Sequence, residues 1–461
     1  MVSELRTLHN TLNQAINIIE GEFSGMGLPE LSTYAQEVHP LDDGQFLPSM
    51  KLFEARRLAL ACIGQLRVLL QVPYEKVVEQ SCAVYDTACL DVFVKAGLVD
   101  ELAKPIHRAT GLHVMDLHAK LDLSPARIAA ILRYLSAQGW LHERAENIFV
   151  LNRPALELLP GSNGRKWSLT PGKPKIAASL LDFVTHPEWK YSLSTAETAF
   201  QLAHNTHETL FEYLKHNPTE LTQWASSVQS YGDACRTALL QDYPWETPIS
   251  KLIVDCGGGQ GCLVSALANT PSLANCNFVI QDLPEVVSSA SANIAQMSPQ
   301  AMLDGRITVE VHNFFEHQPH VADGTVFIFK HILHNWPDSD CVKILKNVAG
   351  AVSGSHFKIL IIENIVVPST VSFDGQSNGP FRRDRGPRIS NAMTLPNYIP
   401  SNFGANSKMS LALGVHMMGV FNARERSLAE WEVLACQSGL RIAAVYPIRA
   451  YVSILECVFS G

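Results

Sequence analysis

Hydrophobic residues near the N-terminus recur at intervals of three and four, the spacing of a helix with one apolar face. They are Leu5, Leu8, Leu12, Ile16 and Ile19. We expect Gly21 to end this helix, which packs either on its own domain or on a partner subunit. Residues 22–50 are rich in Gly, Pro and Ser, so residues 1–50 are predicted to form an N-terminal arm and linker.

A second pattern, over residues 113–151, predicts two short helices followed by a pair of strands. Ser124 is expected to cap the second helix, with Pro125 at its first position and Gly139 at its end. The segment WLHERAENIFVLN then supplies a two-stranded wing. We therefore predict a winged helix within a helical domain over residues 51–165.

From Lys251 onward, short apolar runs alternate with helical patterns, which is typical of βαβ units around a parallel sheet. The predicted fold class is therefore α/β, with a Rossmann-like domain over 246–461 after the all-α, winged-helix domain. Residues 166–245 are expected to be connecting helices that line the substrate site, with Trp224 as a substrate contact. Residues 369–408, rich in Ser, Pro, Gly, Asn and Arg, are expected to form a surface insertion.

The chain is poor in charge: charged residues are 17% of its 461 residues, against roughly 25% in average globular proteins. The net charge of −8 offers no bulk attraction for nucleic acids, which also disfavours DNA binding by the winged helix. The shortage of charge is consistent with an apolar face that is covered in a homodimer. We expect no membrane span, because no apolar run approaches the roughly 20 residues needed.

The ten cysteines include no C-x-x-C pair, so the sequence predicts neither a zinc site nor a redox motif, and no metal. In a chain of this length they are expected to be reduced and mostly buried thiols. The N-terminus has neither the basic region nor the continuous apolar stretch of a signal peptide. Together these features predict a cytoplasmic protein.

A glycine-rich turn follows the first strand of the predicted sheet, in the segment LIVDCGGGQGCLVSALA. Glycines let a backbone approach a ligand closely, and the following helix offers its N-terminus to a negative group. The spacing departs from the G-x-G-x-x-G dinucleotide fingerprint. Instead, Asp255, Gly257, Gly259 and Gly261 resemble motif I of class I S-adenosylmethionine (SAM) methyltransferases. Asp255, Gly257 and Gly259 are therefore candidate cofactor contacts, with a tight turn that binds no ligand as the alternative.

The next two strands end in residues that suit the same cofactor. Asp282 closes FVIQDLP, where an acid can accept both ribose hydroxyls. Asn313 and Phe314 end VEVHNFF, and such an amide can pair with an adenine edge while the ring covers its face. A loop residue and a core aromatic are the alternative for this pair. Fitting residue types at three successive strand ends favour a SAM site.

The fourth strand leads into FIFKHILHNWPDSDCVKIL. This segment strongly resembles the L-[RK]-x-[IV]-L-H-D-W-x-D segment of plant and fungal small-molecule O-methyltransferases of the caffeate and flavonoid type. LIIENIVVP resembles that family's strand with an acidic residue before a proline, and GVFNARERSLAEWEVLACQSGL resembles its G-x-x-E-R-T-x-x-E-[FW]-x-x-L segment. The resemblance extends from about residue 50 to the C-terminus, and the winged helix corresponds to the family's dimerisation domain.

The resemblance implies that His334 is the general base and that Glu363 and Glu425 hold its ring. A phenolic or enolic oxygen has to lose its proton as it attacks the SAM methyl group, and a phenol has a pKa near 10, so a neutral imidazole can assist. A carboxylate on the other ring nitrogen fixes the tautomer. Lys330 and Trp336 correspond to residues near the cofactor. The predicted function is methyl transfer from SAM to such a hydroxyl in secondary metabolism.

Several positions depart from the family pattern. Asn335 and Asn313 stand where the family usually has Asp, and Ser427 stands where it has Ser or Thr. The segment before the E-R-S motif is apolar, so Met417 and Met418 are either contacts of an apolar polyketide or aromatic substrate, or ordinary core residues.

Some fungal relatives of these enzymes catalyse pericyclic reactions instead. They carry out dehydration, hetero-Diels–Alder and Alder-ene reactions on polyketide–pyridone intermediates, and they can bind SAM without consuming it. That resemblance implies that Lys330 polarises a substrate carbonyl, with His331 as a second polar contact. The intact His334, Glu363 and Glu425 favour methyl transfer, whereas the apolar pocket and the departures favour the pericyclic alternative.

Overall fold

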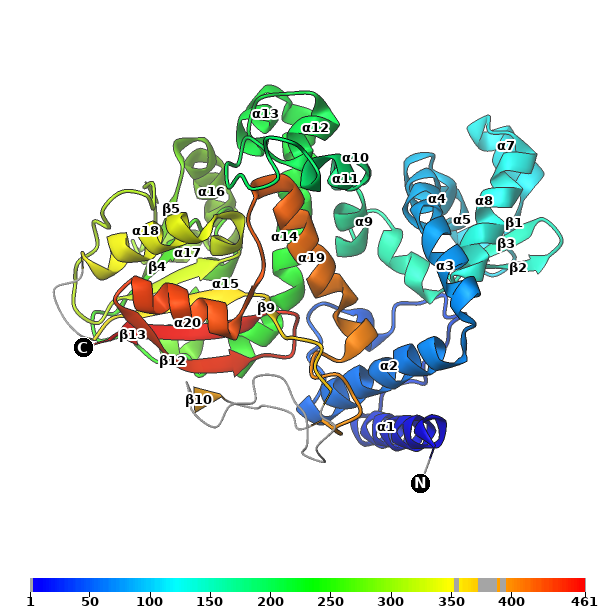
Figure 1. Cartoon of the computed structure of the whole chain (residues 1–461), viewed down its shortest axis with the longest axis horizontal. Coiled ribbons are helices and arrows are strands. Elements are labelled where there is room, and N and C mark those ends of the chain that lie inside the picture. The colour runs from blue at the N-terminus through cyan, green and yellow to red at the C-terminus, as the bar shows by residue number, and fades with distance from the viewer. Residues whose placement is uncertain (1–2, 352–355, 372–387, 390–394, 461) are drawn as a thin grey trace. The chain divides into compact units, whose positions relative to one another are not determined.

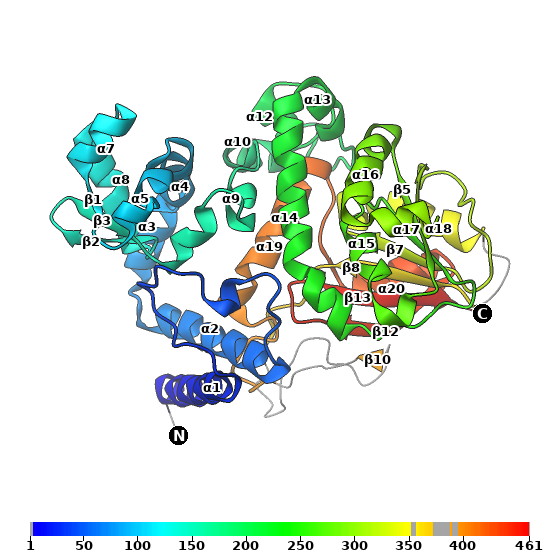
Figure 2. The same ribbon diagram turned by 180° about the vertical axis from the view of Figure 1, so that it is seen from behind.

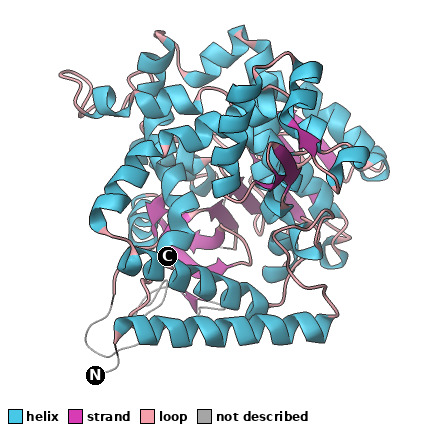
Figure 3. Ribbon diagram, turned by 90° about the vertical axis from the view of Figure 1, so that its right-hand side faces the viewer, coloured by secondary structure: helices cyan, strands magenta, loops and turns pink. Residues whose placement is uncertain are grey.

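The computed structural model describes residues 3–351, 356–371, 388–389 and 395–460. The chain forms two compact units. The helical unit consists of Met1–Lys175 and Phe211–Ala234, and the sheet unit consists of Ile176–Leu210 and Cys235–Gly461. Helices make up most of the regular structure, as the cyan ribbons of Figure 3 show. Among the described residues, no helix has both the length and the apolar character that crossing a bilayer requires.

The helical unit contains one small sheet, in the order β1-β3-β2. Its strands are β1 (Leu112–His113), β2 (Leu141–Ala145) and β3 (Ile148–Leu151). Its helices are α1 (Glu4–Met26), η1 (Pro40–Asp42), α2 (Met50–Leu70), α3 (Pro73–Cys82), α4 (Val84–Lys95), α5 (Leu98–Leu102), α6 (Pro105–Arg108), α7 (Val114–Leu121), α8 (Pro125–Ala137), η2 (Arg153–Leu158), α9 (Asn163–Ser168) and α13 (Leu210–His216). Two further helices, α10 (Lys173–Ala178) and α14 (Pro218–Asp242), have residues in both units, and α13 also begins in the sheet unit at Leu210.

The N-terminal helix α1 has the predicted apolar face and packs on α2 of the same unit. Leu8 and Ala15 on that face are fully buried. The prediction that Gly21 ends the helix is wrong, because α1 continues to Met26. A β-carbon at Gly21 would meet nothing within 4 Å, so this glycine lies on an open helix surface. The chain leaves the helix at Gly27, whose φ of 65° is left-handed.

The two helices and the hairpin expected over residues 113–151 are present as α7, α8, β2 and β3. Ser124 and Pro125 occupy the expected positions at the start of α8, although the Ser124 side chain makes no capping hydrogen bond. Gly139 turns the chain away from the helix with a φ of 84°. Leu132 of α8 and Phe149 of β3 are fully buried in the core of this unit.

The sheet unit contains an eight-stranded sheet in the order β10-β12-β13-β8-β7-β4-β5-β6 (Figure 1). The strands of the unit are β4 (Leu252–Cys256), β5 (Asn277–Asp282), β6 (Ile307–Val311), β7 (Val326–Lys330), β8 (Lys358–Glu363), β9 (Ile365–Val366), β10 (Arg388–Ile389), β11 (Arg426–Ser427), β12 (Leu440–Pro447) and β13 (Ser453–Phe459). Strands β4 to β8 run parallel, β13 is antiparallel to β8 and β12, and β9 pairs separately with β11.

Helices lie on both faces of this sheet. The helices of the sheet unit are α11 (Leu180–Val184), α12 (Ala199–His204), α15 (Cys262–Ala268), η3 (Pro271–Leu273), α16 (Pro284–Met297), α17 (Pro299–Leu303), η4 (Leu333–Asn335), α18 (Asp338–Ala349), η5 (Gly404–Ser407), α19 (Lys408–Phe421) and α20 (Leu428–Gln437). In Figure 1, α18 and α20 lie in front of the sheet, and Figure 2 shows α15 and α16 on the opposite face. Phe327 and Phe329 of β7 are fully buried with Trp431 of α20, which confirms the predicted parallel α/β sheet.

Two other expectations differ from the structure. The connecting helices expected as one block over 166–245 are divided between the two units. The surface insertion expected over 369–408 lies partly outside the described residues, and its described C-terminal part is not a surface loop. Leu395, Ile399 and Phe403 there are at most 1% exposed. These three apolar side chains are buried although the composition around them is polar.

Candidate active site

The carboxyl ends of β4, β5, β7 and β8 meet at one edge of the sheet because these strands are parallel. The glycine turn follows β4, and Asp282 closes β5. Lys330 closes β7, and the short helix η4 with His334 follows it; Glu363 closes β8. The structure therefore gathers the predicted cofactor and catalytic residues of these segments at one edge.

The glycine turn is fixed by backbone hydrogen bonds to β5. Gly257 N–H donates to the Gln281 carbonyl at 2.8 Å, and Gly259 N–H donates to Asp282 Oδ2 at 2.8 Å. Gly257 and Gly259 have φ values of 75° and 54°, which favour glycine. A β-carbon at Gly259 would meet nothing within 4 Å, so the turn exposes open backbone at this position.

Gly258 is a tight position that the sequence analysis did not single out. A β-carbon there would lie 2.9 Å from both Asp255 Oδ2 and the Ile280 side chain. Asp255 is 2% exposed, and burial raises its pKa to about 7, a rise that the charge of Lys330 opposes. Asp255 therefore supports the turn from the interior.

Asp282 presents a carboxylate next to the turn. Its Oδ2 accepts from Gly259 and its Oδ1 accepts from the Leu283 N–H at 2.8 Å, so each oxygen keeps acceptor capacity for a ribose hydroxyl. Burial raises the pKa of Asp282, and the two backbone hydrogen bonds oppose that rise.

Three aromatic rings lie beside the turn. The ring of Trp336 is edge-on to Phe314 at 6.0 Å and to Phe315 at 4.7 Å. The Phe314 ring would lie 3.7 Å from a β-carbon at Gly257. Asn313 Oδ1 accepts from the Phe315 N–H at 3.1 Å, which fixes the turn that follows β6. A glycine turn, a carboxylate for a diol and an aromatic surface together fit the adenosine part of SAM.

The candidate base His334 lies between two carboxylates. Its Nδ1 is 2.7 Å from Glu425 Oε1 and 3.5 Å from Glu363 Oε2, and all three residues are buried. Glu363 Oε1 also accepts the N–H groups of Ile332 at 3.1 Å and His334 at 3.3 Å, so its carboxylate is tied to the turn that carries the base. Because Glu425 engages Nδ1, Nε2 is the ring nitrogen left for a substrate hydroxyl.

The charges around His334 set its protonation. Burial by itself lowers the pKa of the ring, but the negative charges of Glu363 and Glu425 outweigh it and raise this pKa to about 9. Burial raises the pKa of Glu363, and the charge on His334 opposes that rise. At neutral pH the ring therefore holds a proton, and its basic form grows as the pH approaches 9.

His331 adds a second imidazole. Its φ of 56° is unusual for a residue other than glycine, and its Nδ1 lies 3.7 Å from Glu363 Oε2. Its ring lies 5.6 Å from that of His334 and stacks at 6.1 Å on Tyr451. Burial lowers the pKa of His331 well below its usual range, and the charges of Lys330 and His334 lower it further.

One possible metal cluster is found among the described residues. His331, His334 and Glu363 each bring one ligand atom within 4.8 Å of the others. However, Nδ1 of His334 is already in its short contact with Glu425. We therefore relate the cluster to proton chemistry, and the absence of a metal stays a prediction.

The substrate contacts expected from the sequence are less well located. Met417 is buried and Met418 is half-buried on α19, a helix that contacts η4. Trp224 belongs to the helical unit, where it lies edge-on to Phe211 at 5.5 Å. Substrate binding by these residues stays a prediction.

Two positions in the family motifs have a structural role. Asn335 Nδ2 donates to the His331 carbonyl at 3.3 Å, which the carboxylate of an Asp would not do. Ser427 and Glu430 form a capping box at the start of α20, with Ser427 N–H donating to Glu430 Oε2 at 2.8 Å. Besides Gly258, the sequence analysis missed the fully buried Arg426. The sequence feature that could have indicated Arg426 is its position in the E-R-S motif, directly after Glu425.

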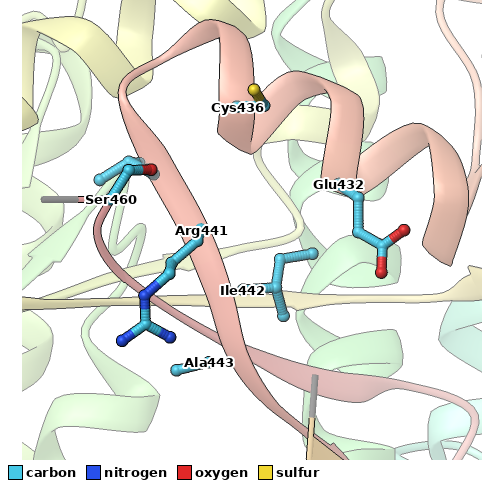
Figure 4. Close-up of a pocket in the computed structure, with 7 residues that line it drawn as sticks. Glu432, Cys436, Arg441, Ile442, Ala443 and Ser460 are labelled. Atoms are coloured by element: carbon cyan, nitrogen blue, oxygen red, sulfur yellow. The ribbon is translucent and has the colours of Figure 1, made fainter. Parts of the chain in front are cut away.

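A separate pocket of about 430 Å³ lies beside α20 and β12 of the sheet unit (Figure 4). It is lined by Glu432, Cys436, Leu440, Arg441, Ile442, Ala443 and Ser460. None of these is a predicted site residue, and Figure 4 shows Glu432 and Cys436 on α20 beside Arg441, Ile442 and Ala443 on β12. The candidate active site is therefore the His334 cluster and not this pocket.

Comparison with known proteins agrees with this assignment. Residues 190–375 match the family model of the O-methyltransferase domain. O-methyltransferase tpcA of Aspergillus fumigatus is 26% identical over 449 residues, which cover 89% of this chain and 88% of that protein. 4-O-methyltransferase 1 of Phanerochaete chrysosporium is also 26% identical, with 97% of this chain and 96% of that protein covered.

A solved structure supports the fold. OxaC has a TM-score of 0.66 at 20% identity and covers 98% of this chain and 100% of its own. A second structure of OxaC contains S-adenosylhomocysteine and oxaline. Solved structures with this fold also include one described as a pericyclic reaction enzyme. Residues 190–375 therefore match an O-methyltransferase domain, the chain is similar over most of its length to fungal O-methyltransferases, and the solved structure of OxaC shows a shared fold.

Proposed function

We propose that this enzyme transfers the methyl group of SAM to a phenolic or enolic hydroxyl of an apolar small molecule, with His334 as the general base. The observation that carries the proposal is the buried 2.7 Å contact between His334 Nδ1 and Glu425, backed by Glu363. Two carboxylates around one imidazole stabilise the imidazolium that forms when the base takes a proton.

The residues at the strand ends fit the cofactor. Asp282 would accept the ribose hydroxyls, the open backbone at Gly259 would face the cofactor, and Phe314 and Trp336 would cover the adenine. Bound SAM supplies an electrophilic methyl group. His334 takes the proton of the acceptor hydroxyl, and its pKa of about 9 lies close to that of a phenol near 10, so the proton transfer is nearly balanced.

The test is incubation of the protein with SAM and a panel of polycyclic phenols, cyclic 1,3-diones and 4-hydroxy-2-pyridones. S-adenosylhomocysteine should appear in step with a methylated product. His334→Gln should lower the rate at least about 100-fold, because the base is lost. His356→Gln is the matched control, since His356 is exposed and pairs with Asp323. Equal loss in both variants, or product without S-adenosylhomocysteine, would contradict the proposal.

A second candidate is a pericyclic reaction with SAM bound but not consumed. Lys330 ends β7 and His331, whose side chain is 8% exposed, follows it directly, so the two polar groups would polarise a substrate carbonyl. The structure described as a pericyclic reaction enzyme has a TM-score of 0.64 at 18% identity, which supports the shared fold. Isomerised or dehydrated product at constant SAM, lost in Lys330→Ala but kept in His334→Gln, would favour this candidate.

We further propose that the helical unit, with its winged helix, forms a homodimer with a second copy and that the sheet unit is the catalytic domain. Helices α2 to α4 expose a run of large apolar side chains. They are Leu60, Ile63, Val68, Leu69, Leu70, Tyr74, Val77, Val78, Val84 and Tyr85. Exposure of this many apolar residues supports an interface.

A reducing location, the cytoplasm, is also part of the proposal. All ten cysteines are free thiols, and Cys62, Cys256 and Cys457 are among those that are buried. Free thiols in this number are typical of reducing compartments.

A further inference from the structure

Arg426 is a long charged side chain with no exposed surface, next to Glu425 in the chain. Its Nη1 donates to the Leu333 carbonyl at 3.0 Å, and its Nη2 donates to the Trp336 carbonyl at 2.6 Å. Leu333 directly precedes His334, and Trp336 follows it by two residues. One planar group therefore bridges the two sides of the turn that carries the candidate base.

The guanidinium is itself held on two further sides. Its Nε donates to Asp338 Oδ1 at 2.8 Å, and Asp338 begins α18, where a negative charge is favourable. Its Cζ lies 5.2 Å from the centre of the Trp431 ring. These contacts restrict the rotamers of Arg426, so its donors have fixed directions.

The turn needs such support because it is short. η4 consists of only three residues, Leu333–Asn335, and a 3₁₀ segment of this length has few hydrogen bonds of its own. We propose that Arg426 is a positioning residue for His334, fixing η4 so that the ring meets Glu425 on one side and the acceptor hydroxyl on the other. The role in turnover rests on the proposed methyl transfer.

The chain offers a matched control. Arg424 binds the other oxygen of the same Asp338 at 2.7 Å, and it also pairs with Glu430 at 3.3 Å. Its side chain is 50% exposed, whereas that of Arg426 is fully buried. Loss of Arg424 thus removes a charge near Asp338 and leaves the two bonds to the carbonyls of the turn in place.

The experiment compares Arg426→Lys, Arg426→Met and Arg424→Met. Steady-state rates use the panel phenol that the wild type methylates fastest. The His334 ring is titrated by NMR on protein with ¹³C-labelled histidine, and His334→Gln identifies its signal. Arg426→Lys should lower kcat about 10- to 100-fold with the KM for SAM within about twofold, because the charge stays but the bridge is lost. Arg424→Met should stay within about twofold of the wild type.

The titration separates positioning from general loss of structure. The charge of Arg426 lowers the pKa of His334, so Arg426→Met should move the titration to higher pH, while Arg426→Lys should leave it near the wild-type position. If Arg426→Lys keeps full kcat, or if Arg424→Met matches its loss, the positioning role is overturned. If the wild type forms no S-adenosylhomocysteine, the proposed function fails, and the titration still tests the contact of Arg426 with the turn.

Discussion

Replacing Glu425 by Gln should shift the pH dependence of methyl transfer to lower pH. A general loss of structure would instead lower the activity at every pH. The substitution keeps the size of the side chain and removes the negative charge 2.7 Å from His334 Nδ1. The folded pKa of His334 is raised from 6.5 to about 9, and the charge of Glu425 is one of two that raise it. Without this charge the pKa should fall, so the basic form of the ring should appear at lower pH.

The expected change in the neutral fraction of His334 follows from the size of its pKa shift. A rise from 6.5 to about 9 corresponds to about 3 kcal/mol of stabilisation of the imidazolium. If Glu425 supplies somewhat under half of this, the variant pKa is about 8, and the neutral fraction at pH 7 rises from about 1% to about 10%. Loss of the charged hydrogen bond should still slow the reaction at high pH, by about 10- to 100-fold.

The assay is kcat/KM for the acceptor between pH 6 and pH 10, because this quantity reports the ionisations of the free enzyme and free substrate. The ratio of variant to wild type cancels the ionisation of the acceptor. We expect this ratio to be about tenfold higher at pH 7 than at pH 10. Glu188→Gln, at an exposed position, should give a constant ratio near one. A constant ratio for Glu425→Gln would refute the assignment of the raised pKa to its charge.

Three further predictions concern the cofactor turn and the interface. Asp282→Asn should raise the Kd for SAM about 10- to 100-fold in calorimetry, since a charged acceptor is lost, and an unchanged Kd would remove Asp282 from the site. Gly258→Ala should lower the melting temperature, because its β-carbon would lie 2.9 Å from Asp255, whereas Gly21→Ala on the open face of α1 should raise it. Val77→Asp should give a monomer mass in light scattering, and an unchanged dimer would place the interface elsewhere.

The part of the site that could be predicted from the sequence lies at strand ends. In a parallel sheet the carboxyl ends of neighbouring strands meet at one edge, so the glycine turn and Asp282 could be assigned to one cofactor site from the strand ends. The short apolar runs that precede them are buried on both faces, which makes their strands easy to recognise. The motif resemblance added His334, Glu363 and Glu425, and Glu425 does not follow a strand of the main sheet.

Features that depend on distant contacts could not be predicted. Gly21 does not end α1, because a glycine on an open helix face costs only about 1 kcal/mol and the packing of α1 on α2 outweighs it. Phe403 is buried although its neighbourhood is rich in polar and turn-forming residues. Arg426 is buried because carbonyls from another segment satisfy its donors, and no local pattern contains that information.

The raised pKa of His334 depends on the two-residue pairing between strands β9 and β11. Strand β11 pairs in parallel with β9, with Arg426 opposite Ile365, so Glu425 and Glu363 precede the same two-residue ladder. This register brings two carboxylates to one imidazole, and their mutual repulsion is relieved when the ring is protonated. The residue after Glu425 is Arg426, whose guanidinium donates to the two carbonyls of the turn that carries His334. A slip of β11 by one residue would move both Glu425, whose charge raises the pKa of His334, and Arg426, whose hydrogen bonds bridge the turn. The same register therefore sets both the proton affinity and the position of the base.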